Sequence, residues 1–484
     1  MLTRIVVHEW RVLRSDRTLL LVLGVLVALV AYAHRSGAAW ERSQRETIAK
    51  VMVDDSTRMA TLTTQLNDLE AGRIEAPPAF QNPSMPAVVG RSLGTRAVVL
   101  TPAPLAATAI GQGDLFPSYA VVSTAAGDPF FKTPSIENPL HLLAGRFDLA
   151  FVVVFLLPLL VLAIGYGMLS QEREDGTLAL LLTQPVVVST LVAGKLLARF
   201  VLIVGGLASS TVVALALTGT AFASTGAVRD LLLWMLVVSV YTLFWLLIVA
   251  LVNVRGRSSA ENAMTLATVW LVLTLVVPSA LNVTATLLYP VPSRAEMIGV
   301  EREAAEEAQE RGASILAAFY QDHPELAPAT AVAGPAGFAA QSWAVQEEVE
   351  RRVAPVRAQY DAQADKQRAL LRRFRFLSPA LLAQEALLDV AGTGEVRYRG
   401  FRSSVHELRV TFREFIGTRI VRNQKIGSGD VMAIPSSHAS VVQAIDATLA
   451  ARVAVNTLGL LLPSVLLLLL LQRWLPGVRE RARG

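Results

Sequence analysis

Residues 147–169 read FDLAFVVVFLLPLLVLAIGYGML, and this stretch decides the class of fold. One charge, Asp148, stands near its start, and none follows before Leu169. A helix of about 20 consecutive apolar residues is long enough to cross a bilayer. The stretch therefore predicts a membrane-spanning helix.

Five further blocks of the chain have the same apolar character. With the first, they predict six spans, at residues 18–34, 147–169, 196–222, 231–252, 263–289 and 453–471. Charged residues make up 17% of the chain, whereas a soluble protein carries roughly 25%. We therefore expect an all-α membrane protein with six transmembrane helices and two large, mainly helical extracytoplasmic insertions, after the first and fifth helices.

The first apolar block allows two interpretations. Ala31-Tyr32-Ala33 after a short apolar core resembles a signal-peptidase site. The residues before it, 1–17, form an additional pattern, because Leu2, Ile5 and Trp10 recur at helical spacing opposite several arginines. Such a helix is suited to lie on the inner leaflet, which is more than a signal peptide needs. We favour an uncleaved first span preceded by a cytoplasmic interface helix.

The arginines set the expected orientation, because short cytoplasmic loops are enriched in positive charge. The charges that would share one side are Arg4, Arg11, Arg14, Arg17, Arg173, Lys195, Arg199, Arg255, Arg257, Arg473, Arg479, Arg481 and Arg483. The opposite short loop has only Arg229. We therefore expect both termini in the cytoplasm. The expected cytoplasmic segments are 1–17, 170–195 and 472–484, and the external insertions are 35–146 and 290–451.

The two insertions are expected to be mostly helical. Residues 40–72 are polar and helix-favouring and would extend the first span outward, before a proline-rich stretch from 77 to 139. In the second insertion, the helical segments expected are 294–320, 338–377 with Pro355 inside it, 378–390 and 405–416. No sustained alternation of apolar and polar residues indicates a strand there.

The chain lacks the loop that binds ATP phosphates. The nearest approach to a Walker A motif is Gly194-Lys195, but Ser189 stands in place of the first glycine and Leu196 in place of Ser or Thr. We therefore expect no enzyme activity and no cofactor in this chain. ATP hydrolysis, where it is needed, would come from a separate subunit.

Ion-coupled transport is also disfavoured. Such carriers place ionisable residues in mid-membrane despite the cost, and the middles of all six predicted spans have none. Asp148, Lys195 and Arg199 fall near span ends, where a long side chain can snorkel to the surface. This distribution points to an external source of energy.

Other chemistries have little support in the sequence. The absence of cysteine excludes a thiolate metal site and a cysteine nucleophile. His8-Glu9 and His406-Glu407 each lack the second histidine of a zinc-binding helix. The net charge is +5, but no basic run is interleaved with aromatic residues as a nucleic-acid groove requires. We expect no metal and no nucleic acid.

The segment from Gln171 to Pro185, QEREDGTLALLLTQP, is the most informative one for function. Gly176 would end one helix and Pro185 the next, which leaves a short apolar helix from Thr177 to Thr183. Its Leu178, Leu181 and Leu182 would share a face. An apolar face outside the bilayer needs cover, and the cover is either the protein's own membrane domain or a cytoplasmic partner.

At these residues the chain resembles the ABC type-2 exporter permeases. The matching residues are Glu172, Gly176, Thr177, Leu181, Leu182, Pro185 and Lys195. The charged helix from Glu9 to Arg17 ahead of the first span is also similar. The resemblance covers nearly the whole chain, in a poorly characterised bacterial subgroup with large extracytoplasmic insertions, and the segments that carry this are 138–148 and 378–401.

In that family the loop is similar to a coupling helix that sits in a cleft of the ATPase subunit. The resemblance implies an ATPase-coupling role for Glu172, Glu174, Gly176, Thr177, Leu178, Leu181, Leu182 and Pro185. It further implies the permease subunit of an ATP-binding cassette transporter, an exporter, which dimerises with an identical or paralogous permease along spans two and five.

A separate ABC ATPase, membrane lipid and an extracytoplasmic partner of the outer domains are the other expected partners. The alternative is a membrane scaffold or maturation factor that works with an ATPase but moves no cargo itself. No motif in the sequence identifies the transported molecule.

Overall fold

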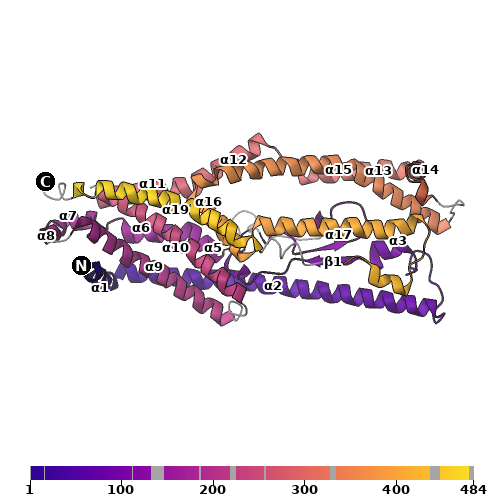
Figure 1. Cartoon of the computed structure of the whole chain (residues 1–484), viewed down its shortest axis with the longest axis horizontal. Helices are drawn as coiled ribbons and strands as arrows, with labels where there is room; N and C mark the ends of the chain where they lie inside the picture. Colours follow the sequence, from indigo (N-terminus) through magenta and orange to yellow (C-terminus); the bar gives the residue numbers. More distant parts are fainter. Residues whose placement is uncertain are drawn as a thin grey trace.

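A computed structural model describes residues 2–15, 17–111, 113–131, 147–184, 187–218, 225–255, 258–327, 334–436 and 447–478. The molecule is elongated, with a bundle of apolar helices at one end and long helices around a small sheet at the other (Figure 1). The first helix, α1 (Leu2–Ser15), and the end of the last helix, α19 (Leu449–Trp474), lie at the bundle end. A chain that crosses the membrane an even number of times begins and ends on the same side, so its first and last helices must lie at the same end.

Six helical segments of the described chain are long and apolar enough to cross a membrane. They are Leu20–Glu70, Leu149–Glu174, Val188–Ala216, Gly226–Val254, Ser259–Leu288 and Leu449–Trp474. Each contains or overlaps one of the predicted spans, so the all-α fold with six membrane helices is confirmed. The third begins earlier than predicted, because Val188, Leu191 and Val192 are buried in a cluster with the neighbouring helices.

The helices that make these spans are interrupted in two places. Their bounds are α2 (Arg17–Glu70), α5 (Leu149–Phe151), the π-helix η4 (Val152–Leu156), α6 (Leu157–Gly165), α9 (Val188–Thr218), α10 (Thr225–Val254), α11 (Ser259–Leu271), the π-helix η5 (Val272–Val276) and α12 (Val277–Leu288). The centre of the bundle is α10, whose Trp234, Tyr241 and Trp245 are fully buried.

Both interruptions occur just before a proline, which has no N–H to donate. Pro158 follows η4, and the carbonyl of Val154, its partner in an ideal α-helix, accepts a hydrogen bond from the Tyr241 hydroxyl at 2.9 Å instead. Pro278 follows η5, and the Leu273 carbonyl accepts from the Ser378 hydroxyl at 2.7 Å. A side chain from another element thus bonds one carbonyl group at each break.

The first span continues outward as one helix. The 54 residues of α2 make a rod about 80 Å long, which runs from the bundle to the far end of the molecule (Figure 1). The predicted outward extension of the first span is therefore confirmed. Leu62 and Leu66 near its far end are buried in the outer core.

The outer part of the chain packs against this rod. Its elements are α3 (Pro86–Val88), the π-helix η1 (Val89–Leu93), η2 (Ala106–Thr108), η3 (Pro129–Phe131), α13 (Arg294–Glu310), α14 (Gly312–Asp322), η6 (Pro324–Leu326), α15 (Gly334–Phe374), η7 (Arg375–Leu377), α17 (Glu395–Val421) and η8 (Ser428–Ala433). Strands β1 (Arg96–Val99) and β2 (Tyr119–Val122) pair antiparallel, with Arg96 opposite Val122. Phe401 and Phe412 of α17 fill the core beneath them.

Helix α16 (Pro379–Ala391) was expected in the second external insertion, but it packs among the membrane helices. Its N-cap residue Ser378 bonds Leu273, which lies 15 residues, or roughly 20 Å, before the end of α12. Gly459 of α19 lies so close to this turn that a Cβ there would be 2.9 Å from the Phe376 ring. The insertion therefore re-enters the bundle, and α16 is too short to cross it.

Candidate functional site

The loop between the second and third spans forms two short helices, α7 (Ser170–Glu174) and α8 (Thr177–Thr183). Gly176 separates them with φ +72°, a left-handed conformation that glycine adopts without strain. The Thr177 hydroxyl donates to the Glu172 carbonyl at 3.1 Å. The predicted short helix is confirmed, while Pro185, its predicted stop, lies outside the described residues.

Leu178 and Leu182 share one side of α8, and the protein's own membrane helices cover this side. Leu178 is only 1% exposed and lies in a cluster with Met168, Leu169 and the end of α19. Leu182 packs against the same cluster, and Leu181 is half-buried. Leu180 is the leucine that points outward, with 69% exposed. The interior of the bundle thus covers one side of α8, and Leu180 marks the other.

A cluster of four charges, which we call the inner ionic cluster, fixes the loop to the bundle. It consists of Glu9 of α1, Glu172 of α7, and Lys195 and Arg199 of α9. The Lys195 ammonium donates to Glu9 Oε1 and to Glu172 Oε1, both at 2.7 Å. Arg199 Nη1 donates to Glu9 Oε2 at 3.1 Å. One lysine therefore joins α1, α7 and α9.

Three of these charges are almost completely withdrawn from solvent, and the Glu172 side chain is 25% exposed. Lys195 is 3% exposed, Glu9 5% and Arg199 7%, so the two cations do not snorkel as expected. Burial of an ion costs several kcal/mol unless a partner compensates it, and two cations here balance two carboxylates. Burial alone would raise the pKa of Glu9, but the charges and hydrogen bonds of Lys195 and Arg199 outweigh it and lower that pKa.

Two further contacts hold the loop to neighbouring helices. Glu174 accepts from the backbone N–H of Ser259 at 2.6 Å and from its hydroxyl at 2.9 Å, so it binds the start of α11. Asn253 at the end of α10 is fully buried. It accepts from the Leu169 N–H at 3.1 Å and donates to the Gly165 carbonyl at 3.0 Å.

A cleft of about 930 Å³ opens beside the inner ionic cluster. It lies between α1, the start of α2, the α6–α7 junction and α9, and Glu9, Glu172, Lys195 and Arg199 line it. The loop therefore has a rigid attachment on one side and open space on another. The inner ionic cluster connects α7, which leads into α8, to α1 and α9.

The sequence singled out Glu172, Glu174 and Lys195, but not the pairing of Glu172 with Lys195 or the contact of Lys195 with Glu9. Glu9 was noted only as part of the amphipathic helix, and it lies 186 residues from Lys195. One feature of the sequence indicated a charged cluster here. Lys195 and Arg199 are four residues apart, which puts two cations on one helical face. Among the described residues, no group of three or more His, Cys, Asp or Glu has a geometry that could hold a metal ion.

Residues 138–277 match the family model described as "ABC-2 family transporter protein". The matched range contains α7, α8, Lys195 and Arg199. This match supports an ABC-2 type permease. Residues 294–440 match a second family model, described as a domain of unknown function, DUF3526. No curated protein and no solved structure gives a match to the chain.

The two matched ranges fall mostly on the membrane part and on the outer part of the chain. The first range covers the second to fourth spans and most of the fifth, and the second covers α13 to η8. The second range includes α16, so the domain of unknown function supplies the helix that re-enters the bundle. The outer part is thus tied directly to the membrane helices of this permease.

Proposed function

We propose that the chain is the membrane subunit of an ATP-driven exporter, and that a separate ABC ATPase docks on α7 and α8. Two copies of the permease, or this chain and a paralogue, would enclose the path of the cargo. The ATPase would bind from the cytoplasm, where the distribution of arginine puts both termini and the loop. The membrane would be the inner membrane of a bacterium.

The observation that carries this proposal is the position of Lys195. Its two hydrogen bonds join the loop to the surface helix α1 and to the third span. A short helix of seven residues is not stable alone in water, so its position is set by what it is attached to. A movement of the ATPase against α8 would therefore be passed to α1 and α9.

The surface of α8 suits such a partner. Leu180 is 69% exposed beside the exposed Thr177, Ala179, Thr183 and Gln184. A helix whose far side packs on the bundle presents this surface in a fixed orientation. Glu172 and Glu174 are bound within the chain, so they would position the loop rather than meet the partner directly.

The fifth span supports a second permease subunit. In its most apolar window only 11% of the residues are buried, compared with 72% in the fourth span. A second subunit would cover part of this surface, and lipid would cover the rest. The seam between the two subunits would run along the second and fifth spans, as the family resemblance implies.

The proposed docking is tested with Leu180→Asp and Leu181→Asp, by co-purification with a candidate ABC ATPase from the same genome. Burial of a leucine is worth about 1.5–3 kcal/mol, so each substitution at a docking surface should weaken binding roughly tenfold to a hundredfold. ATPase activity stimulated by the permease should fall in parallel.

Two controls separate docking from folding. Phe80→Asp makes the same kind of change at an exposed residue (74% exposed) near the opposite end of the molecule and should leave co-purification intact. Leu178→Asp should destabilise the bundle itself, because that side chain is buried. If Leu180→Asp and Leu181→Asp retain full co-purification and stimulated activity, α8 is not the docking helix.

A further inference from the structure

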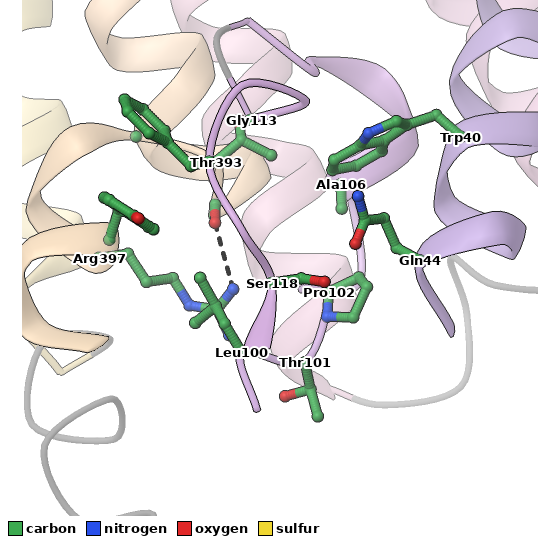
Figure 2. A pocket seen from close by; sticks show the side chains of 14 residues that line it. Trp40, Gln44, Leu100, Thr101, Pro102, Ala106, Gly113, Ser118, Thr393 and Arg397 are labelled. Atoms are coloured by element: carbon green, nitrogen blue, oxygen red, sulfur yellow. Dashed lines mark hydrogen bonds between the residues drawn. The ribbon is translucent and has the colours of Figure 1, made fainter. Parts of the chain in front are cut away.

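The cleft beside the inner ionic cluster differs in size and in available charge from a pocket in the outer part of the molecule. The outer pocket, between α2 and α17 (Figure 2), has a volume of about 50 Å³, and Arg397 in its lining donates to the Gly392 carbonyl at 3.1 Å. The inner cleft has a volume of about 930 Å³, and pockets that hold small molecules have about 300–1,000 Å³. The inner cleft is therefore the better candidate for a ligand site.

The cleft lies at the expected inner boundary of the membrane. The second span begins at Leu149, and Met168 belongs to the cleft lining. The helical rise between these two residues is about 30 Å, which is the thickness of the hydrocarbon core. Tyr166 also lines the cleft and is 40% exposed, and tyrosine is enriched where the membrane meets water. Lipid head groups are therefore expected at the depth of this cleft.

The apolar side chains and the unpaired charges of the lining lie at different depths. Val22 and Ile164 belong to the first and second spans, whereas Asp175 follows α7. In Figure 1, α7 lies further than α6 from the outer part of the molecule. Arg199 reaches the depth of Ile164, whose carbonyl it bonds at 3.2 Å, but Glu9 compensates its charge. The cleft thus suits an amphiphile whose polar end lies toward α7.

Two opposite charges of the lining are available to a ligand. Arg11 belongs to α1, and Asp175 is the C-cap residue of α7. Both side chains are exposed, and in the described part of the chain neither has an ion-pair or hydrogen-bond partner. His8 is exposed as well and lines the cleft three residues before Arg11, so the two share a face of α1. Helix α1 therefore offers a positive group to the cleft, and α7 offers a negative one.

A ligand that carries both charges suits this lining better than a ligand with a single charge. The inner ionic cluster balances its own two cations with two carboxylates, so Arg11 and Asp175 determine what the rest of the lining attracts. Arg11 would attract an anion that Asp175 repels, and the reverse holds for a cation. A phosphate joined to an ammonium group satisfies both residues with charge-assisted hydrogen bonds.

We propose that the cleft binds the zwitterionic head group of a phospholipid that carries a primary amine. Arg11, with His8 beside it, would donate to the phosphate, and the ammonium group would donate to Asp175. The acyl chains would lie beside Val22 and Ile164. The lipid would connect α1 to α7 in addition to the inner ionic cluster, and its binding does not depend on the docking of an ATPase.

The test is titration calorimetry with the purified full chain in non-ionic detergent. The probes are dihexanoyl phosphatidylethanolamine, dihexanoyl phosphatidylcholine and dihexanoyl phosphatidylglycerol, together with soluble phosphoethanolamine. We expect the ethanolamine lipid to bind at least about tenfold more tightly than the other two lipids. The choline lipid has no ammonium N–H to donate to Asp175, and the glycerol lipid brings no cation to it.

Variants of the two charges separate the two contacts. Arg11→Gln should weaken all three lipids by a similar factor of about three to ten, because each lipid carries the phosphate. Asp175→Asn should weaken only the ethanolamine lipid, about tenfold, and so abolish the preference for it. Two controls should bind all three lipids as wild type does. They are Arg4→Gln, on α1 but outside the cleft lining, and Asp54→Asn, at an exposed residue of α2.

The outcomes distinguish a lipid from the other possible ligands. Displacement of the ethanolamine lipid by phosphoethanolamine at similar concentration shows that the head group alone is bound, which overturns the lipid as the ligand. Equal affinity for the three lipids would overturn the proposal, as would an Asp175→Asn variant that unfolds at the wild-type temperature and keeps the preference. If no lipid binds and Arg11→Gln weakens co-purification with the ATPase, the cleft belongs to that partner and the proposal is wrong.

Discussion

Both ends of the molecule join their elements through buried ion pairs, but they join elements of very different size. At the inner end, Lys195 joins α7, which has five residues and leads directly into the seven-residue α8, to α1 and α9. At the outer end, Glu350 joins α15 to α17, which have 41 and 27 residues. Long helices have a large apolar core as well, whereas the short helices depend on their few contacts.

The outer ion pairs are as well formed as the inner ones. Glu350 accepts from Arg409, from the Gly127 N–H at 2.7 Å and from Arg357 at 3.3 Å. One turn earlier, Glu347 accepts from Arg413 at 2.5 Å. Because the apolar core beneath α17 supports the same helices, loss of one outer pair should leave the fold in place. Loss of an inner pair should release the loop.

The largest effect is expected from Lys195→Ala. The variant leaves Glu9 with Arg199 alone and Glu172 without its lysine, and a broken buried ion pair costs about 3–5 kcal/mol. ATPase stimulation by the permease should be lost, because Lys195 no longer ties α7, and through it α8, to α1 and α9. Thermal unfolding and ATPase assays measure the two effects. Lys50→Ala, at an exposed lysine of α2, is the control, and equal behaviour of the two variants would contradict the role of the cluster.

A smaller effect, with a characteristic dependence on pH, is expected from Glu350→Gln. Burial alone would raise the pKa of Glu350, but Arg409, the Gly127 N–H and Arg357 lower it to about 2. The unfolded carboxylate titrates near 4.5. The folded state therefore gains about 3 kcal/mol above pH 4.5, and this gain is lost as the pH falls from about 4.5 to 2.

The measurement is the unfolding temperature of the purified chain between pH 7 and pH 3. Wild type should lose stability as the pH falls through this window, and Glu350→Gln should be less stable at pH 7 and change less with pH. Glu310→Gln, at an exposed residue of α13, should follow wild type. If the unfolding temperature of Glu350→Gln falls with pH as steeply as that of wild type, another group causes the acid sensitivity.

The smallest effect is expected from Tyr241→Phe. It removes only the hydroxyl that satisfies the Val154 carbonyl at the proline break in the second span, which should cost about 1–3 kcal/mol. Hydrogen exchange should become faster in residues 155–160 and unchanged in α19. Tyr289→Phe serves as the control, and unchanged exchange in Tyr241→Phe would mean that the break needs no support from α10.

The spans and the loop were predictable because their signals are local. An apolar run long enough to cross the bilayer has few possible structures other than a membrane helix. Gly176 predicts a helix boundary because glycine readily adopts the left-handed conformation. The long outward extension of the first span followed from the helix-favouring composition of residues 40–72.

The remaining features depend on contacts between distant segments. Glu9 and Lys195 meet only in the folded bundle, and the direction of Leu178 depends on the cluster that α19 helps to form. Helix α16 is apolar but too short to span, so its sequence does not distinguish an outer helix from one that re-enters the bundle. The pairing of β1 with β2 likewise involves strands of only four residues each.

The central claim is that α8 contacts a separate ABC ATPase, and a photo-crosslink tests it most directly. A benzophenone amino acid replaces Leu180 in one variant and Phe80 in another, and each is irradiated in membranes that contain the ATPase. We predict an adduct with the ATPase from position 180, stronger with nucleotide bound, and none from position 80. An ATPase that co-purifies with the Leu180 variant but gives no adduct there would contradict the account.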